Sequence, residues 1–190
     1  KSKIESSKAE EISNKIEEHI IQNTNKFSAF FSGFAESFLG VKCSLTFDSL
    51  DGSNAKRFYP IIDGKIRRFE EELSESQRFF IDHSFRMSIL TFFYTKPTFY
   101  IVETPDSSLD ISYEKNAADV FLKFLMTPNS LIITSNLNNS SFINHIIQNE
   151  QDVKISMIGL LDIAKQSLIQ NTSENLRMIY NDIKNQINNK

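Results

Sequence analysis

The sequence predicts an α/β fold, with a mostly parallel sheet flanked by helices and preceded by a leading helix and a hairpin. Two uninterrupted apolar runs at 98–102 and 131–134 are the main observation, because parallel strands covered on both faces have this composition. A helical segment at 114–126 separates the runs, and a strand–helix–strand order forms a right-handed crossover. We therefore expect the two strands to be parallel neighbours with buried side chains, including those of Phe99, Ile101 and Ile132.

Length and composition are those of a globular domain. The 190 residues are 40% hydrophobic and 24% charged, so the chain can bury a core. The net charge of −3 gives no overall attraction to nucleic acid or anionic membrane. No apolar run approaches the roughly 20 residues of a membrane span, so we expect no membrane partner.

The first residue and the single cysteine of the sequence bear on two questions, whether the chain is a fragment and which compartment it occupies. Cys43 excludes an intrachain disulfide and fits a reducing, cytoplasmic compartment. The sequence begins at Lys1 without Met and has no signal-peptide layout, so we expect it to be a piece of a longer polypeptide.

Residues 1–26 are expected to form a leading helix, and residues 27–190 the lobe that follows it. Isoleucines recur at multiples of four among charged residues, at Ile4, Ile12, Ile16 and Ile20, which gives one apolar stripe. Two interpretations stay open: a surface helix of this domain, or the returning end of a long coiled coil. The pattern is too short to decide, because a coiled coil is recognised over three or four heptads.

A second helical stretch at 27–39 leads into the hairpin, with strands at 42–47 and 57–62 and a tight turn at Asp63-Gly64. Basic residues gather around this hairpin: Lys56, Arg57, Lys65, Arg67 and Arg68. One interpretation is a patch for the DNA backbone. A solvated hairpin is favoured, because three glutamates at 70–72 follow immediately.

The central helix begins at Ser74, where Gln77 completes a capping box. Apolar residues from Phe79 to Phe93 cover nearly all of its faces, which predicts a fully buried helix. Three further helices are expected at 140–149, 154–170 and 173–188. His19, His83 and His145 lie at scattered positions, and we interpret them as structural.

Three polar motifs follow one another along the chain. The first is Leu73-Ser74-Glu75-Ser76-Gln77 at a helix start, where free N–H groups and the helix dipole favour phosphate. The second follows strand 98–102 and reads Glu103-Thr104-Pro105, then Ser107-Ser108-Leu109-Asp110. The third is Ser135-Asn136, directly after the next strand.

In this order the motifs resemble the C-terminal half of an ABC-type ATPase head of the SMC and RecN kind. Residues 73–77 match the family's Leu-Ser-Gly-Gly-Gln at three of five positions, and the turn through Asp110 matches its Ser-x-Leu-Asp. The resemblance implies Mg²⁺ and ATP as cofactors, with nucleotide contacts from Ser74, Ser76, Gln77, Ser108 and Asp110. Ser74 read alone is equally a plain cap, and Asp110 has the alternative role of capping the next helix.

The gap-free match places Glu103 at the magnesium position and Thr104 at the position of the catalytic base. Thr104 is not a general base of the usual kind. The alternative register makes Glu103 the base and leaves Val102 at the metal position. Asn136 or Ser135 stands where many relatives have a histidine that senses the γ-phosphate, and either side chain can hydrogen-bond a phosphate.

The phosphate loop Gly-x-x-x-x-Gly-Lys-Ser/Thr is missing from the sequence. The resemblance therefore implies an N-terminal half of the same ATPase as the first partner, a second head as the next, and DNA as a further one. The function expected is ATP-driven pairing of heads in DNA repair or anti-phage defence. The alternative is a degenerate head that serves as a scaffold, which Thr104 and Glu75 favour; a generic helical interaction domain would leave the ordered motifs unexplained.

Overall fold

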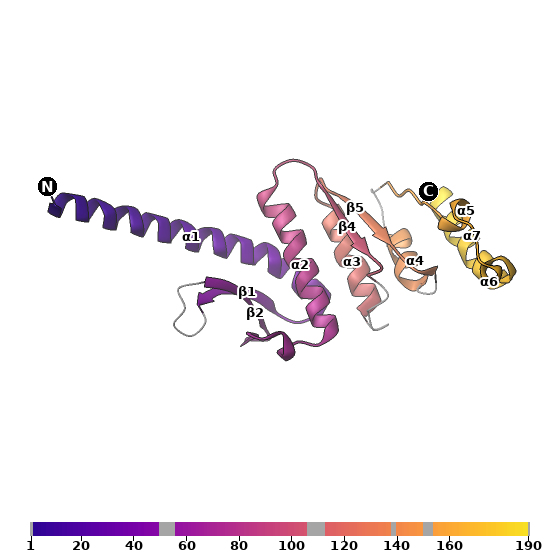
Figure 1. Cartoon of the computed structure of the whole chain (residues 1–190), viewed down its shortest axis with the longest axis horizontal. Helices are drawn as coiled ribbons and strands as arrows, with labels where there is room; N and C mark the ends of the chain where they lie inside the picture. Colours follow the sequence, from indigo (N-terminus) through magenta and orange to yellow (C-terminus); the bar gives the residue numbers. More distant parts are fainter. Residues whose placement is uncertain (1, 50–55, 106–112, 138–139, 150–153, 190) are drawn as a thin grey trace. The chain divides into compact units, whose positions relative to one another are not determined.

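The computed structural model describes residues 2–49, 56–105, 113–137, 140–149 and 154–189. Contacts between residues divide the chain into two compact units, Lys1–Thr95 and Lys96–Lys190. Figure 1 shows helices and small sheets in both, so the fold is a mixed α/β fold with a long leading helix. Asp110 and Ser108 lie outside the described residues.

The first unit consists of two helices and a small antiparallel sheet. Its elements are α1 (Ser2–Leu39), β1 (Cys43–Ser49), β2 (Lys56–Ile62), β3 (Lys65–Ile66), the 3₁₀ turn η1 (Glu70–Glu72) and α2 (Glu75–Phe93). The strands pair in the order β1-β2-β3. Asp63 and Gly64 have φ of 48° and 75°, as a two-residue hairpin turn requires. The predicted hairpin and turn are confirmed.

The leading helix runs unbroken past residue 26 to Leu39. Its last third carries the core of the unit, because Phe27, Phe31 and Ala35 pack against Cys43, Leu45 and Ile62 of the sheet. Residues 7–23 are exposed. The helix ends at Gly40, whose φ is 69° and which suits a left-handed helix end.

Helix α2 is less buried than its sequence predicts. Its buried residues are Phe80, Ser84, Met87 and Ser88, while Phe93 is 65% exposed. The prediction of burial on all faces is wrong, because within this unit α2 packs against α1 and the hairpin on one side. A stripe of half-buried residues makes this contact: Ile81, Phe85, Ile89 and Phe92.

The second unit contains a parallel pair of strands and its helices. The elements are β4 (Phe99–Glu103), α3 (Glu114–Leu125), β5 (Ser130–Thr134), α4 (Ser140–Asn149), α5 (Leu160–Ile163), α6 (Leu168–Thr172) and α7 (Glu174–Asn188). Strands β4 and β5 are parallel neighbours, with Ile101 opposite Ile132, which confirms the predicted pairing. The single helix predicted at 154–170 is wrong. Separate caps at Gly159 and Ser167 start the short helices α5 and α6 instead.

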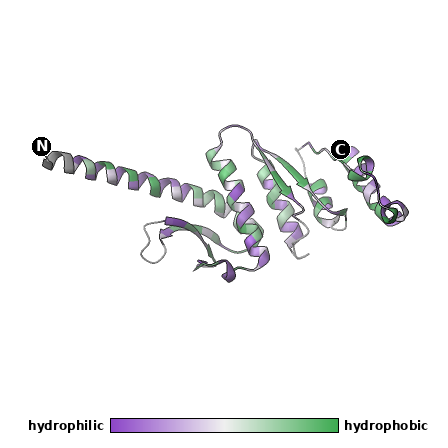
Figure 2. Ribbon diagram, in the orientation of Figure 1, coloured by the Kyte–Doolittle hydropathy of each residue, from purple (hydrophilic) through white to green (hydrophobic). Residues whose placement is uncertain are grey.

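The burial of the β4–β5 pair is one-sided. Tyr100 and Val102 are buried, and the Tyr100 ring lies 6.0 Å from the Phe124 ring of α3. Phe99, Ile101 and Ile132 are 61%, 58% and 51% exposed, so the prediction that they are buried is wrong. Successive side chains of a strand point to opposite faces, and the described helices of the unit cover only one face. Figure 2 shows that both strands are mainly hydrophobic along their length.

Candidate functional site

The start of α2 is a well-formed helix cap. The hydroxyl of Ser74 accepts a hydrogen bond from the Gln77 backbone N–H at 3.2 Å, and the Gln77 side chain accepts from the Ser74 N–H at 3.1 Å. This is the predicted capping box. Ser74 is exposed, and Ser76 and Gln77 are half-buried, so the hydroxyl at the helix start is accessible to a ligand.

Glu72 organises the turn that leads into this helix. Its carboxylate accepts hydrogen bonds from the backbone N–H groups of Arg68 at 2.6 Å and Phe69 at 3.2 Å. The hydrogen bonds from Phe69 and Arg68, together with the charges of Arg67 and Arg68, lower the pKa of Glu72. Arg78 then forms an ion pair with Glu70 at 2.8 Å. Sequence reasoning missed this role of Glu72. The available signal was a carboxylate four residues after Arg68 and three after Phe69, the spacing at which a side chain can accept from the backbone N–H groups of a turn.

The carboxyl ends of β4 and β5 bring four polar residues of the second unit together. Glu103 is opposite Thr134 in the register, and Ser135 and Asn136 follow β5 directly. Glu103 and Asn136 are exposed, whereas Val102 is 2% exposed. The valine side chain has no oxygen, so of Val102 and Glu103 it is Glu103 whose side chain could bind a cation.

The residues fit a magnesium ion of the kind that keeps most of its waters. Mg²⁺ is commonly bound by one or two carboxylates together with substrate phosphates, and Glu103 supplies one accessible carboxylate at the strand end. Within the described residues there is no group of three or more metal-ligating side chains, so this part of the chain contains no metal cage of its own.

Backbone geometry at the strand end is unusual. Thr104 has a φ of 40°, a left-handed conformation that β-branched residues rarely adopt. Its N–H donates to both the carbonyl oxygen and the hydroxyl of Thr134, at 2.9 and 3.0 Å. Pro105, the next residue, is fully buried. Sequence reasoning did not single out Thr134, because only the strand register places it beside Glu103.

The structure places the motifs in different units. Ser74, Ser76 and Gln77 lie in the first unit, and Glu103, Thr104 and Asn136 lie in the second. The residues of the second unit are brought together, and the cap is a separate feature.

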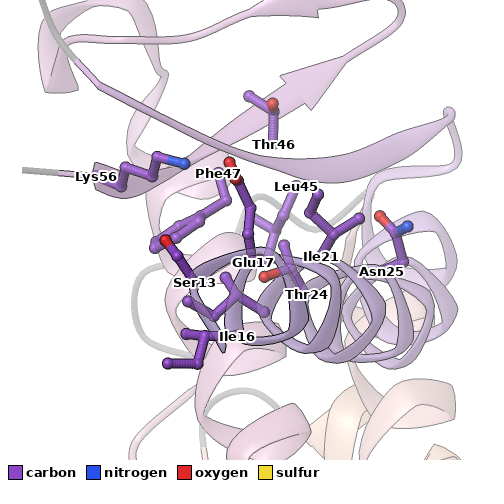
Figure 3. A pocket seen from close by; sticks show the side chains of 11 residues that line it. Ser13, Ile16, Glu17, Ile21, Thr24, Asn25, Leu45, Thr46, Phe47 and Lys56 are labelled. Atoms are coloured by element: carbon purple, nitrogen blue, oxygen red, sulfur yellow. The ribbon is translucent and has the colours of Figure 1, made fainter. Parts of the chain in front are cut away.

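A groove between α1 and the hairpin is a second candidate binding surface. It has a volume of about 510 Å³ and combines the apolar side chains of Ile16, Ile20, Leu45 and Phe47 with the charges of Glu17 and Lys56. Figure 3 shows the side chains of Glu17 from α1 and Phe47 from β1 reaching into the space between the helix and the strand. The exposed stripe of Ile12, Ile16 and Ile20 continues along the same helix and suits a partner helix.

Two of the histidines, His83 and His145, make local contacts within their units. His83 lies against Phe79, with ring centroids 4.1 Å apart, and burial lowers its pKa to about 4. His145 Nε2 lies 2.6 Å from an oxygen of Asp119, and the Asn149 amide is 3.2 Å from its other ring nitrogen. His19 is exposed on α1. Across the described residues no helix is both long and apolar enough to cross a membrane.

Comparisons with known proteins give structural similarities alone. No family model matches the chain, and no curated protein matches its sequence. The Smc head domain from Pyrococcus furiosus, solved with an extended coiled coil and bound to the C-terminal domain of ScpA, superposes with a TM-score of 0.51 and 20% identity. The match covers 73% of this chain and 34% of that chain.

Other matches are also SMC heads. An SmcHead bound to the C-winged helix domain of ScpA gives a TM-score of 0.47 at 20% identity, covering 61% of this chain and 36% of that one. The SMC head domain from Thermotoga maritima gives 0.45 at 12% identity, covering 69% and 43%. The chain thus spans about a third of the Pyrococcus furiosus chain that it matches. Its described fold is similar to part of an SMC head domain.

Proposed function

We propose that this chain is the C-terminal lobe of an SMC-like ATPase, whose heads pair on ATP and separate on hydrolysis. The observation that carries the proposal is the strand end of the second unit, where Glu103 lies beside Thr134 and before Asn136. The carboxyl ends of neighbouring parallel strands are where open α/β sheets bind ligands. The similarity to the Pyrococcus furiosus Smc head supports the same proposal through the fold.

Each residue of the strand end has a proposed task. Glu103 would accept hydrogen bonds from waters of a bound Mg²⁺, and that ion would neutralise charge on the phosphates. Thr104 would orient the attacking water through its hydroxyl without removing a proton. The Asn136 amide would donate to a phosphate oxygen. The burial of Val102 supports this register over the one in which Glu103 is the base.

The nucleotide contacts would be shared between heads. Ser74, Ser76 and Gln77 would meet the γ-phosphate of ATP held by a second copy of the head, since a helix start offers N–H groups and a favourable dipole. Ser108 and Asp110 belong to the same proposal through the family resemblance. The complete ATPase would act on DNA in the cytoplasm, in repair or anti-phage defence.

An N-terminal half of the same ATPase would complete the site. The sequence has no phosphate loop, and the β4–β5 pair exposes Phe99, Ile101 and Ile132. Parallel sheets are normally covered on both faces, so an apolar face of this kind supports a missing partner lobe that would also bring the phosphate loop.

Phosphate release by the complete protein tests this function. Glu103→Gln should lower the rate at least about tenfold, because Mg²⁺-bound water loses its anionic acceptor. Glu174→Gln, a change in the first turn of α7, is the matched control and should leave the rate unchanged. This chain alone should bind no Mg-ATP in calorimetric titration. A rate that is the same in Glu103→Gln and wild type would contradict the catalytic function.

A non-catalytic scaffold is the second candidate. The strand end offers a threonine where a hydrolytic head would need a base, and Glu75 places a carboxylate in the first turn of α2, where it would repel phosphate. A scaffold would form dimers in light scattering while releasing no phosphate in the wild-type protein, and this outcome separates the two functions.

A further inference from the structure

The conformation of Thr104 is the starting point. Among the described residues, Asp63 and Thr104 are the non-glycine positions with positive φ. Asp63 lies in a hairpin turn, whose geometry requires such a φ. Thr104 directly follows β4 and is β-branched, and such residues rarely adopt a φ of this sign; it also precedes Pro105, which disfavours helical backbone angles and favours an extended one. Two independent steric preferences therefore oppose the conformation that this residue adopts.

Thr134 provides the hydrogen-bond acceptors that hold Thr104 in this conformation. The Thr104 N–H points at the last residue of β5 and donates to its carbonyl oxygen at 2.9 Å and to its hydroxyl at 3.0 Å. The fully buried ring of Pro105 anchors the chain on the other side. At the opposite end of the sheet, the side chain of Asn129, the residue before β5, accepts from the Thr98 N–H at 3.0 Å. Each end of β4 is therefore held by a hydrogen bond to a residue at the corresponding end of β5.

We propose that Thr134 is a positioning residue: its hydroxyl, together with its carbonyl, holds Thr104 in the left-handed conformation and so sets the direction of the Glu103-Thr104 strand end. Strained residues of this kind persist only where their surroundings hold them, and they are concentrated at functional sites. The catalytic consequence rests on the proposed function; the hydrogen bond itself does not.

Loss of the hydroxyl has a defined structural effect. Thr134→Val keeps the side-chain shape and the strand pairing but removes one of the two acceptors that Thr134 offers to the Thr104 N–H. Thr104 then relaxes toward the extended conformation that a residue before proline prefers. A misplacement of about 1 Å at a reacting group costs up to about 100-fold in rate, so we expect kcat to fall by about tenfold or more. KM should change less, because the proposed contacts of Ser74 and Gln77 with nucleotide stay in place.

The test compares three variants of the complete protein: Thr134→Val, Thr134→Ser and Thr172→Val. Serine restores the hydroxyl and should return both readouts to within about twofold of wild type. Thr172 is the matched control, since its hydroxyl donates to the Leu168 and Ile169 carbonyls within α6, at 3.1 and 3.2 Å, and makes no described hydrogen bond to β4 or β5. The readouts are hydrogen exchange at the Thr104 amide and the steady-state constants for ATP hydrolysis.

Faster exchange and lower kcat in Thr134→Val, rescue in Thr134→Ser and no change of either in Thr172→Val would support the proposal. Unchanged Thr104 exchange in Thr134→Val would overturn it, whatever the activity. Faster exchange with an unchanged kcat would also overturn it, because the held conformation would then have no catalytic use. A wild-type protein that hydrolyses no ATP would overturn the proposed function, and the exchange rate alone would then decide whether Thr134 holds Thr104.

Discussion

The fold changes the acid–base behaviour of His83. It lies on α2 against the Phe79 ring. Burial lowers its pKa from 6.5 to about 4; Asp82 opposes this shift and Arg86 adds to it. The imidazole is therefore neutral in the folded protein at pH values where an exposed histidine would be partly charged.

This shift predicts a loss of stability in mild acid. The folded pKa of about 4 lies below the ordinary value of 6.5, so between these values the unfolded chain binds the proton more readily. The contribution of neutral His83 is fully present above pH 6.5 and declines as the pH falls towards 4. We expect the urea midpoint of wild type to drop more between pH 7 and pH 5 than that of His83→Gln.

Circular dichroism of the complete protein can follow this unfolding. His19→Gln removes an imidazole from an exposed stretch of α1 and controls for the loss of a histidine as such. Equal pH dependence in wild type and His83→Gln would show that His83 is solvated in the folded protein.

At the scale of elements, regular patterns predicted structure well where local chemistry and packing agree. The Asp63-Gly64 turn, the Ser74 capping box and the parallel pairing of β4 with β5 follow from the sequence. Each depends on a short range of residues or on a continuous apolar run. The same apolar runs place the candidate residues Glu103 and Asn136 at strand ends, whereas the resemblance alone implies their roles.

The prediction of burial from the sequence was wrong where burial depends on which helices are available to cover a surface. Ile101 has the same apolar character as Val102, yet Ile101 is 58% and Val102 2% exposed, because α3 covers one face of the strand pair. Phe93 is exposed for a similar reason, because α1 and the hairpin cover only one side of α2. The bifurcated bond from Thr104 to Thr134 was equally inaccessible, since it depends on the strand register and on a φ that a Thr-Pro sequence argues against.

The exposed face of the β4–β5 pair leads to a prediction about the partner lobe. Ile101 and Ile132 are opposite each other in the register, and burying one isoleucine side chain contributes about 1.5–3 kcal/mol. Changing both to lysine should weaken association with the N-terminal half at least about tenfold. The lobe itself should keep its melting temperature, because neither side chain is in its core.

Co-purification of separately tagged halves, followed by titration calorimetry, measures this association. Met126→Lys is the matched control, because Met126 follows α3 and is 86% exposed away from the strand register. Equal affinity of the double variant and wild type would mean that another surface joins the halves.

At the scale of the whole molecule, the cap in the first unit and the strand end in the second belong to separate bodies. The proposed function gives them separate tasks: the strand end would act on nucleotide in its own head, and the cap would meet nucleotide held by another copy. Ser74 is suited to this task, because its hydroxyl accepts only one described hydrogen bond, from Gln77, and the residue is exposed.

Ser74→Arg should therefore abolish ATP-dependent pairing of the complete protein. The longer side chain keeps the facing surface away, although its charge attracts phosphate and partly offsets this effect. Loss of the cap costs about 0.5–2 kcal/mol, which the Phe-rich core around α1 and α2 can absorb. Light scattering with a non-hydrolysable ATP analogue distinguishes dimer from monomer.

Two variants serve as controls for this measurement. Ser74→Thr keeps a capping hydroxyl and should pair as wild type does. Ser167→Arg removes the same capping box from α6 and should also leave pairing intact. Dimers of Ser74→Arg as abundant as those of wild type would reduce Ser74 to a helix cap.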